Sequence, residues 1–197
     1  MENQYSFIKT VFEQTITLNR EKYKDIEHLL DDDTKYFLFE FGIPDQYTVF
    51  EFIDSDFYNE EYNILCLGHN GKKFNGKIDS GGSYIGIDLN TNEVIMFYDF
   101  GKSGKCILAF SLKNFILIMF EFEMFYKTYG ISDKNEPNER VNRRETRRFY
   151  MDYLGYRLLQ IDSKFFEIYD NKYVTDPNYY WGSVLEEMEN GIMFRWI

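Results

Sequence analysis

Residues 84–126, YIGIDLNTNEVIMFYDFGKSGKCILAFSLKNFILIMFEFEMFY, decide the fold of this chain. Residues 84–89 alternate large apolar side chains with small or polar ones, and residues 93–100 are rich in β-branched and aromatic side chains. Both patterns predict half-buried strands. The residues between them are Asn-Thr-Asn, and asparagine tolerates the positive φ that a tight turn demands. The two strands are therefore predicted to form a β-hairpin.

A third strand and a long helix are predicted to follow this hairpin. The turn GKSGK (101–105) precedes the apolar run 106–110, which is expected to lie beside the hairpin as a third antiparallel strand. Ser111 supplies an N-cap for a helix over 112–129, which has apolar residues on nearly every face and should be largely buried. Its uninterrupted apolar run, 115–120, is far shorter than the roughly 20 residues that cross a membrane. It is therefore predicted to be a core helix.

The flanking segments are predicted to add helices at both ends and two strands before the hairpin. Helical character is expected over 1–30, and a short helix follows Asp31, Asp32 and Asp33 and ends at Gly42, before Pro44. Strands are expected at 47–53 and 62–67, exposed or flexible loops at 54–61 and 68–82, and helices at 141–160 and 179–189. The last helix is expected to bury Trp181, Val184, Leu185 and Met188.

This order of elements predicts an α+β fold class. We expect a single domain over residues 1–197, with a mainly antiparallel, twisted sheet of about five to six strands packed against helices, and helical N- and C-terminal segments. A chain of 197 residues with 44% hydrophobic and 20% aromatic content is long and apolar enough for such a core.

The charge and the cysteines restrict the partners and the location. The chain has 33 acidic residues against 22 lysines and arginines, a net charge of −11. This charge disfavours direct binding to nucleic acid or an anionic membrane and favours a basic partner, although it can also serve solubility alone. Cys66 and Cys106 lie in apolar runs without metal-binding spacing, so we expect reduced thiols. With no secretory signal or transmembrane candidate, a cytoplasmic location is predicted.

No motif indicates catalysis, a cofactor or a metal. His28 and His69 lack metal-binding spacing, and the glycines of 68–82 lack the spacing of a phosphate-binding loop. A Cys66/His69 pair of nucleophile and base is conceivable but disfavoured, because strand residues three apart rarely aim at one point and a buried thiol is usually inert. We therefore predict a binding protein rather than an enzyme, with no catalytic, cofactor-binding or metal-binding residues.

Five arginines at helical spacing form a predicted basic stripe late in the chain. Such a stripe can bind phosphate. Glutamates interleave with it and the whole chain is acidic, so a solvated face with local ion pairs is favoured. The arginines are Arg140, Arg143, Arg144, Arg147 and Arg148.

Several segments, taken in order, resemble the SUKH superfamily with its Smi/Knr-like fold, in particular its fourth group of bacterial immunity proteins. The segment FLFEFGIPDQYTVFEF (37–52) is similar to the family's early helix, glycine, proline and aromatic strand. ILCLGHNG (64–71) and the hairpin at 84–97 are similar to its glycine-bearing strand and "GID, turn, EV" hairpin. ILAFSLKNFILIMFEF (107–122) and DPNYYWGSVLEEMENG (176–191) resemble its next strand and helix and its terminal signature. The resemblance covers about residues 34–191.

The resemblance implies a cytoplasmic immunity protein that neutralises a cognate polymorphic toxin, frequently a nuclease, by tight stoichiometric binding. An acidic inhibitor can accelerate its encounter with a basic toxin and cover the toxin's active site. In the predicted loop, acidic side chains would steer the partner and exposed aromatic side chains would anchor it. These candidate contact residues are Asp54, Asp56, Phe57, Tyr58, Glu60, Glu61 and Tyr62.

Two other classes of function stay open at this point. One is an intracellular scaffold or regulatory module with the same fold and no toxin partner. The other, ranked lowest, is a hydrolase that uses Cys66 or a pair of carboxylates. The sequence favours neither a monomer nor a dimer.

Overall fold

The computed structural model describes two compact units, residues 1–119 and 120–197. The described residues are 5–12, 14–45, 57–70, 73–74, 77–78, 83–97, 105–129, 144–163, 166–169, 172–175, 181, 184–186 and 188. The predicted strand at 47–53 lies outside them, and the prediction of a single domain over 1–197 stays a prediction.

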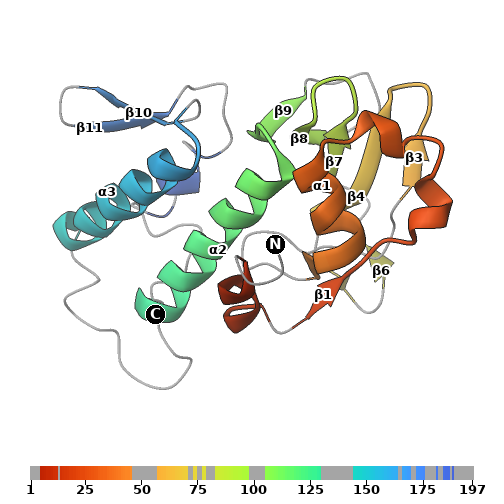
Figure 1. The fold of residues 1–197 in the computed structure, drawn as a ribbon. Coiled ribbons are helices and arrows are strands. Elements are labelled where there is room, and N and C mark those ends of the chain that lie inside the picture. The colour runs from red at the N-terminus through yellow and green to blue at the C-terminus, as the bar shows by residue number, and fades with distance from the viewer. Residues whose placement is uncertain are drawn as a thin grey trace. The chain divides into compact units, whose positions relative to one another are not determined.

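The first unit is built on a five-stranded antiparallel sheet, drawn as yellow to green arrows in Figure 1. Its strands lie in the order β3-β4-β7-β8-β9, so that β7 is central and β3 and β9 are the edges. The predicted α+β class with an antiparallel sheet is confirmed. The strands are β3 (Phe57–Asn59), β4 (Ile64–Asn70), β7 (Ser83–Asp88), β8 (Glu93–Phe97) and β9 (Cys106–Ala109).

The predicted hairpin, third strand and helix are all present. β7 and β8 pair in antiparallel register from Tyr84↔Phe97 to Asp88↔Glu93, and β9 pairs with β8. The turn between β7 and β8 places Asn92 at a φ of 60°. Ser111 then caps α2 (Leu112–Tyr129), because its Oγ accepts a hydrogen bond of 3.1 Å from the backbone N–H of Asn114.

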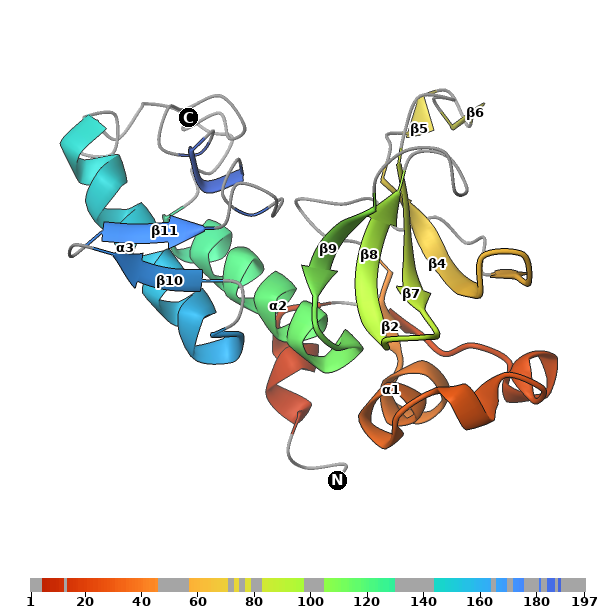
Figure 2. The ribbon, with the colours of Figure 1, turned by 90° about the horizontal axis from the view of Figure 1, so that it is seen from above.

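The two faces of this sheet are covered to different degrees. On one face the apolar side chains of β4, β7 and β8 are fully buried, and the sheet packs against α2, whose first turns are buried as well (Figure 2). These side chains include Leu65, Ile85, Ile87 and Val94. On the other face, four buried residues (Ile64, Cys66, Ile95 and Phe97) are flanked by four that are only partly buried (Phe57, Tyr62, Tyr84 and Ile107). This second face is the less protected one.

The N-terminal segment has short 3-10 turns where the sequence indicated longer helical character. These turns are η1 (Ser6–Thr10), η2 (Arg20–Tyr23) and η3 (Glu27–Leu29). Between η1 and η2 the β-branched pair Thr15–Ile16 forms strand β1, which pairs with β2 (Ile43–Pro44). Because β-branched residues favour extended backbone, this pairing limits the length of the helical turns.

The short helix after the aspartates is confirmed, with a change of geometry at its end. Asp31 caps α1 (Asp32–Tyr36) by accepting a hydrogen bond of 2.6 Å from the N–H of Thr34. The helix then widens into a π-helical turn, η4 (Phe37–Phe41), which ends at Gly42. Gly42 has a φ of 91°, and a Cβ there would lie 2.9 Å from the side chain of Thr15. Glycine is therefore needed for both conformation and space.

The second unit combines helices with a hairpin. The end of α2 is joined in it by α3 (Arg144–Ile161), as predicted from residue 144 onward, and by the antiparallel pair β10 (Phe166–Tyr169) and β11 (Lys172–Thr175). The described residues between 181 and 188 are helical, and the four side chains expected to point inward are buried. Trp181 stacks on Phe122 of α2 with ring centroids 5.1 Å apart.

Three predicted boundaries are wrong. β4 begins at Ile64 rather than residue 62 and runs on to Asn70, and the predicted loop at 54–61 contains β3. The expected connection at 68–82 also contains the short paired strands β5 (Lys73–Phe74) and β6 (Lys77–Ile78). The hairpin of β10 and β11 was not predicted, although its two β-rich runs flank Asp170 and Asn171, a common turn pair.

The close approach of β4 and β7 predicts the effect of a methyl group at Gly86. A Cβ there would lie 2.8 Å from the backbone oxygen of Leu65 and 2.9 Å from the side chain of Ile64. The backbone atoms cannot move without disturbing the central strand pair, so Gly86→Ala should lower the free energy of unfolding by about 1–3 kcal/mol. Urea denaturation measures this. A loss below about 0.5 kcal/mol, as for an ordinary surface substitution, would contradict it.

Candidate partner-binding surface

Two turns are joined by hydrogen bonds at one end of the five-stranded sheet. The turn 60–63 links β3 to β4, and the turn 89–92 links β7 to β8. Asn63 Nδ2 donates to Asn90 Oδ1 at 2.8 Å, and the N–H of Leu89 donates to the carbonyl of Asn63 at 2.9 Å. These bonds hold the two turns in a fixed relation.

The second turn also binds the chain just before α1. Asn92 Nδ2 donates to the carbonyl of Leu29 at 3.1 Å, and Asn92 Oδ1 accepts from the N–H of Asp31 at 3.2 Å. Asn63 and Asn92 both have positive φ, 52° and 60°. Asparagine is suited to both tasks, because it tolerates the left-handed region and its amide can donate and accept at once.

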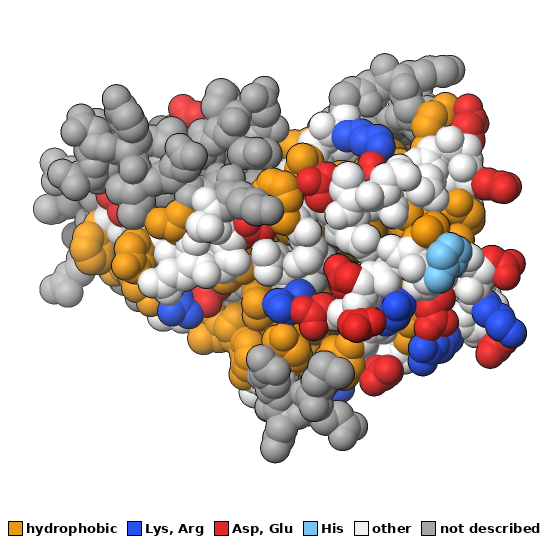
Figure 3. Space-filling view, turned by 45° about the horizontal axis from the view of Figure 1, so that its top comes forward, with side chains coloured by type: hydrophobic (Ala, Val, Ile, Leu, Met, Phe, Trp, Pro, Cys, Tyr) orange, Lys and Arg blue, Asp and Glu red, His pale blue; other side chains and the backbone are white. Residues whose placement is uncertain are grey.

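We call the carboxylates carried by these three segments the acidic turn surface: Asp31, Asp32, Glu60, Glu61 and Glu93. All are exposed except Glu93, which is half-buried. Asp32 pairs with Lys35 at 3.4 Å, whereas Glu60 and Glu61 form no ion pair with any residue that the structure describes. On the face drawn in Figure 3, acidic side chains lie beside lysines and arginines in several places. Exposed, uncompensated charge is therefore found at the first turn.

A buried carboxylate, Asp88, forms an ion pair with the exposed Lys105 beside the second turn. Asp88, only 7% exposed, accepts hydrogen bonds from Lys105 Nζ at 2.7 Å and from the backbone N–H and side-chain amide of Asn90, both at 3.0 Å. Burial disfavours the charged carboxylate, but these hydrogen bonds and the charge of Lys105 outweigh it and lower the pKa of Asp88. Asp88 thus fixes Asn90 in the turn as an anion.

The structure separates the predicted contact residues into two groups. Glu60 and Glu61 are exposed in the turn, as expected. The aromatic residues are half-buried rather than exposed: Phe57 and Tyr62 pack on the partly covered sheet face, and the Tyr58 hydroxyl donates to Asn63 Oδ1 at 3.0 Å. Asp54 and Asp56 lie outside the described residues.

The sequence alone did not indicate a binding role for the other residues of this surface. Asn63 was not singled out, and Asp31 was interpreted only as a helix cap. Asn90 and Asn92 were recognised as turn residues, but side-chain bonds across about 30 to 60 residues of chain carry no local pattern. The asparagines in both turns were the one available signal.

Other predicted features can be placed only in part. Among the described residues there is no cluster of three or more potential metal ligands and no helix long and apolar enough to cross a membrane. Cys66 is buried and Cys106 is half-buried, and neither forms a disulfide bond. Of the predicted arginine stripe, Arg148 pairs with Asp152 at 3.4 Å, whereas Arg140 and Arg143 lie outside the described residues.

Comparison with known proteins identifies no relative of this chain. No protein-family model, no curated protein and no solved structure matches it. The interpretation of the surface therefore depends on its own chemistry.

Two substitutions at Asn92 should separate its backbone role from its side-chain role. Asn92→Gly keeps the positive φ but loses two hydrogen bonds, each worth about 1 kcal/mol. Asn92→Ala loses the same bonds and also places a non-glycine residue in the left-handed region, at a further cost of about 1 kcal/mol. Stability measured by urea denaturation should therefore fall from wild type to the glycine variant and further to the alanine variant. Equal stability of the two variants would contradict the strain argument.

The lowered pKa of Asp88 predicts how stability depends on pH. A carboxylate with a lowered pKa in the folded state contributes stability above its unfolded pKa, near about 3.9, and the contribution is lost as pH falls through the folded value. Asp88→Asn should be less stable than wild type at pH 7, and the difference should shrink as pH falls below about 4. Unfolding curves from pH 7 to the lowest pH at which both remain folded test this, with Glu93→Gln as the matched control. A constant difference would contradict it.

Proposed function

We propose that this chain is an immunity-type protein that binds a cognate toxin with a basic, nuclease-like domain and neutralises it by stoichiometric protein–protein inhibition. The acidic turn surface would be the first contact. The observation that carries the proposal is the hydrogen-bonded pair of turns that presents Glu60 and Glu61 without a compensating cation among the described residues.

The rigidity of the turns supports a binding role. Surfaces that keep their conformation on binding lose less entropy than flexible loops do. Here the Asn63–Asn90 bond and the contacts of Asn92 restrain both turns before a partner arrives. A restrained acidic surface can therefore bind with little ordering cost.

The charge of the chain supports the choice of partner. The net charge of −11 attracts a cationic protein over a distance set by the ionic strength, about 10 Å at 0.1 M salt. A nuclease needs cationic side chains to hold phosphate, and an acidic inhibitor can occupy the same side chains. This chemistry agrees with the family resemblance described above.

The aromatic residues are half-buried, so they would anchor a partner less than the sequence indicated. Phe57 and Tyr62 contribute to the apolar cluster, so their exposed edges can add only part of their area to an interface. Exposed polar groups at the tip of the second turn, Asn90 and Thr91, are better placed to contact a partner first. We therefore propose that Glu60 and Glu61 steer the partner and that Asn90 and Thr91 form hydrogen bonds with it.

Charge reversal of Glu60 and Glu61 tests the proposal. The tagged chain would be used to capture its partner from the lysate of its own host, and the recovered partner would then be used for binding kinetics. Glu60→Lys with Glu61→Lys should reduce the association rate about tenfold or more at low salt, with a smaller effect at high salt, because steering is screened.

The matched control reverses the same number of charges elsewhere. Glu21 and Glu40 are exposed and lie outside the acidic turn surface, so Glu21→Lys with Glu40→Lys should retain most of the association rate. Equal effects of the two double variants would show that only net charge matters. Failure to recover a toxin-like partner when that partner is expressed would refute the immunity function itself.

A further inference from the structure

A chain of side-chain hydrogen bonds joins the two turns to a lysine that precedes the edge strand β9. The Tyr58 hydroxyl donates to Asn63 Oδ1 at 3.0 Å, and Asn63 Nδ2 donates to Asn90 Oδ1 at 2.8 Å. Asn90 Nδ2 donates to Asp88 Oδ1 at 3.0 Å, and Lys105 Nζ donates to Asp88 Oδ2 at 2.7 Å. We call these five residues the turn network. They come from β3, from both turns, from the end of β7 and from the residue before β9.

The carboxylate of Asp88 sets the orientation of both amides in this network. A carboxylate only accepts hydrogen bonds, so Asn90 has to present its NH₂ group to Asp88 and its carbonyl oxygen to the other side. Asn63 then presents its own NH₂ group to that oxygen, which leaves its carbonyl oxygen for the hydroxyl of Tyr58. The donors therefore all point toward the anion, and in such a chain each bond polarises and strengthens the next.

Lys105 is the cation that compensates this anion. Asp88 is only 7% exposed, and burial of an uncompensated carboxylate is costly. The ammonium group of Lys105 supplies the opposite charge from a side chain that is itself 40% exposed. Without that charge, Asp88 would have to turn toward solvent or take up a proton. Either change would weaken the bonds that Asp88 accepts from Asn90.

The bond between the two turns depends on its neighbours in the network. The Asn63–Asn90 bond is exposed, and there water competes for both amides and an isolated hydrogen bond contributes little to stability. Each amide is also held from its far side, Asn90 by Asp88 and Asn63 by Tyr58. We therefore expect a disturbance at Asp88 to reach Asn63. Glu60 and Glu61 directly precede this part of the chain, in the turn that ends at Asn63.

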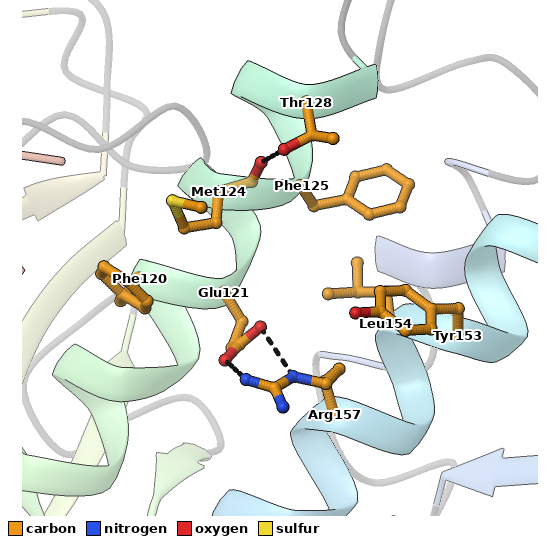
Figure 4. Close-up of a pocket in the computed structure, with 8 residues that line it drawn as sticks. All are labelled: Phe120, Glu121, Met124, Phe125, Thr128, Tyr153, Leu154 and Arg157. Carbon is orange, nitrogen blue, oxygen red and sulfur yellow. Dashed lines mark hydrogen bonds and ion pairs between the residues drawn. The ribbon is translucent and has the colours of Figure 1, made fainter.

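An ion pair in the second unit shows the difference between a network and a simple pair. Arg157 of α3 donates to Glu121 of α2 at 2.6 and 3.2 Å, on one side of a pocket between these helices. In Figure 4 this pair is bonded to none of the other residues drawn. The loss of such a pair affects its two partners and is of small energetic value. The Lys105–Asp88 pair, in contrast, continues into two amides and a hydroxyl.

We propose that Lys105 is a positioning residue for the acidic turn surface, which it holds in place through the turn network. Its effect on the conformation of the turns follows from the network alone, whereas its role in partner binding rests on the proposed function. A cation would thereby promote the binding of a basic partner, although its own charge opposes that binding. The two effects of Lys105 have opposite signs, so they can be separated by experiment.

Amide hydrogen exchange of the full chain, measured by NMR, tests the inference without a partner. Lys105→Met should raise the exchange rates of the Tyr62 amide, bonded within the first turn, and of the Leu89 amide, bonded to the carbonyl of Asn63. We expect an increase of about tenfold or more, as for the loss of one hydrogen bond to a charged group. Lys105→Arg keeps the charge and should stay within about threefold of the wild-type rates.

Lys113→Met is the matched control. Lys113 is 34% exposed and pairs with Asp33 at 2.6 Å, so this variant also removes one charge and one ion pair from the same unit. It leaves the turn network intact, and the exchange rates of the two turn amides should therefore remain at their wild-type values. An increase in Lys105→Met that is no larger than the increase in this control would overturn the inference.

The opposite end of the network gives a second test. Tyr58→Phe keeps the ring and removes the hydroxyl that holds Asn63. It leaves the buried carboxylate compensated, so it gives a result even if Lys105→Met does not fold. Because both substitutions break one network, the double variant should show a smaller increase in exchange rate than the product of the two single increases. Multiplicative effects would overturn the coupling between the two ends.

The captured partner then tests the role in binding. Lys105→Met makes the chain more acidic than its net charge of −11, so steering alone predicts equal or faster association with a basic partner. Positioning predicts that the complex dissociates about fivefold faster or more, whereas Lys113→Met should bind at least as well as wild type. Unchanged or tighter binding of Lys105→Met would overturn the positioning role. Failure to recover any partner would refute the proposed function, and the exchange measurement would still decide whether Lys105 holds the turns.

Discussion

The first unit depends on the pairing of β7 with two strands at once. As the central strand, β7 is bonded to β4 on one side and β8 on the other, and Gly86 lets the β4 backbone approach to a distance that a side chain would prevent. A central strand forms backbone hydrogen bonds on both sides, so its position cannot shift without breaking two ladders. The pairing of β7 therefore also sets the positions of the turns at the end of the sheet.

The acidic turn surface is a consequence of that register. Asn59↔Ile64, Ile64↔Asp88 and Asp88↔Glu93 lie on one line across four strands, so the turns that follow these residues emerge side by side. The side chain of Asn63 then bonds the first turn to the second, and the side chain of Asn92 bonds the second turn to the segment before α1. Charge at this end of the sheet is thus positioned by backbone pairing, whereas most other ion pairs of this unit are isolated surface contacts of small energetic value.

Local patterns predicted the parts of this fold that depend on neighbouring residues. The alternation in 84–89, the Asn-Thr-Asn turn and the cap at Ser111 were sufficient for the hairpin and α2. The N-terminal segment was harder, because β1 forms only when Thr15 meets Pro44, a partner about 30 residues away that no local pattern reveals. The candidate site was predicted through Glu60 and Glu61 alone. Polarity of the flanking sequence predicted an exposed loop, but the pairing of Phe57 with Cys66 places Phe57 and Tyr58 in a strand, and Tyr62 packs from the turn onto the same sheet.

The edge strands of the sheet are short, and this affects how readily the protein can aggregate in a cell. In the described part of the chain, β3 has three residues and β9 has four, and β9 meets β8 through an irregular register. Short or irregular edges offer little template for strand addition by another chain. If the chain acts by the one-to-one inhibition proposed above, it must be at least as abundant as its target, and short edges that resist edge-to-edge aggregation would allow that abundance.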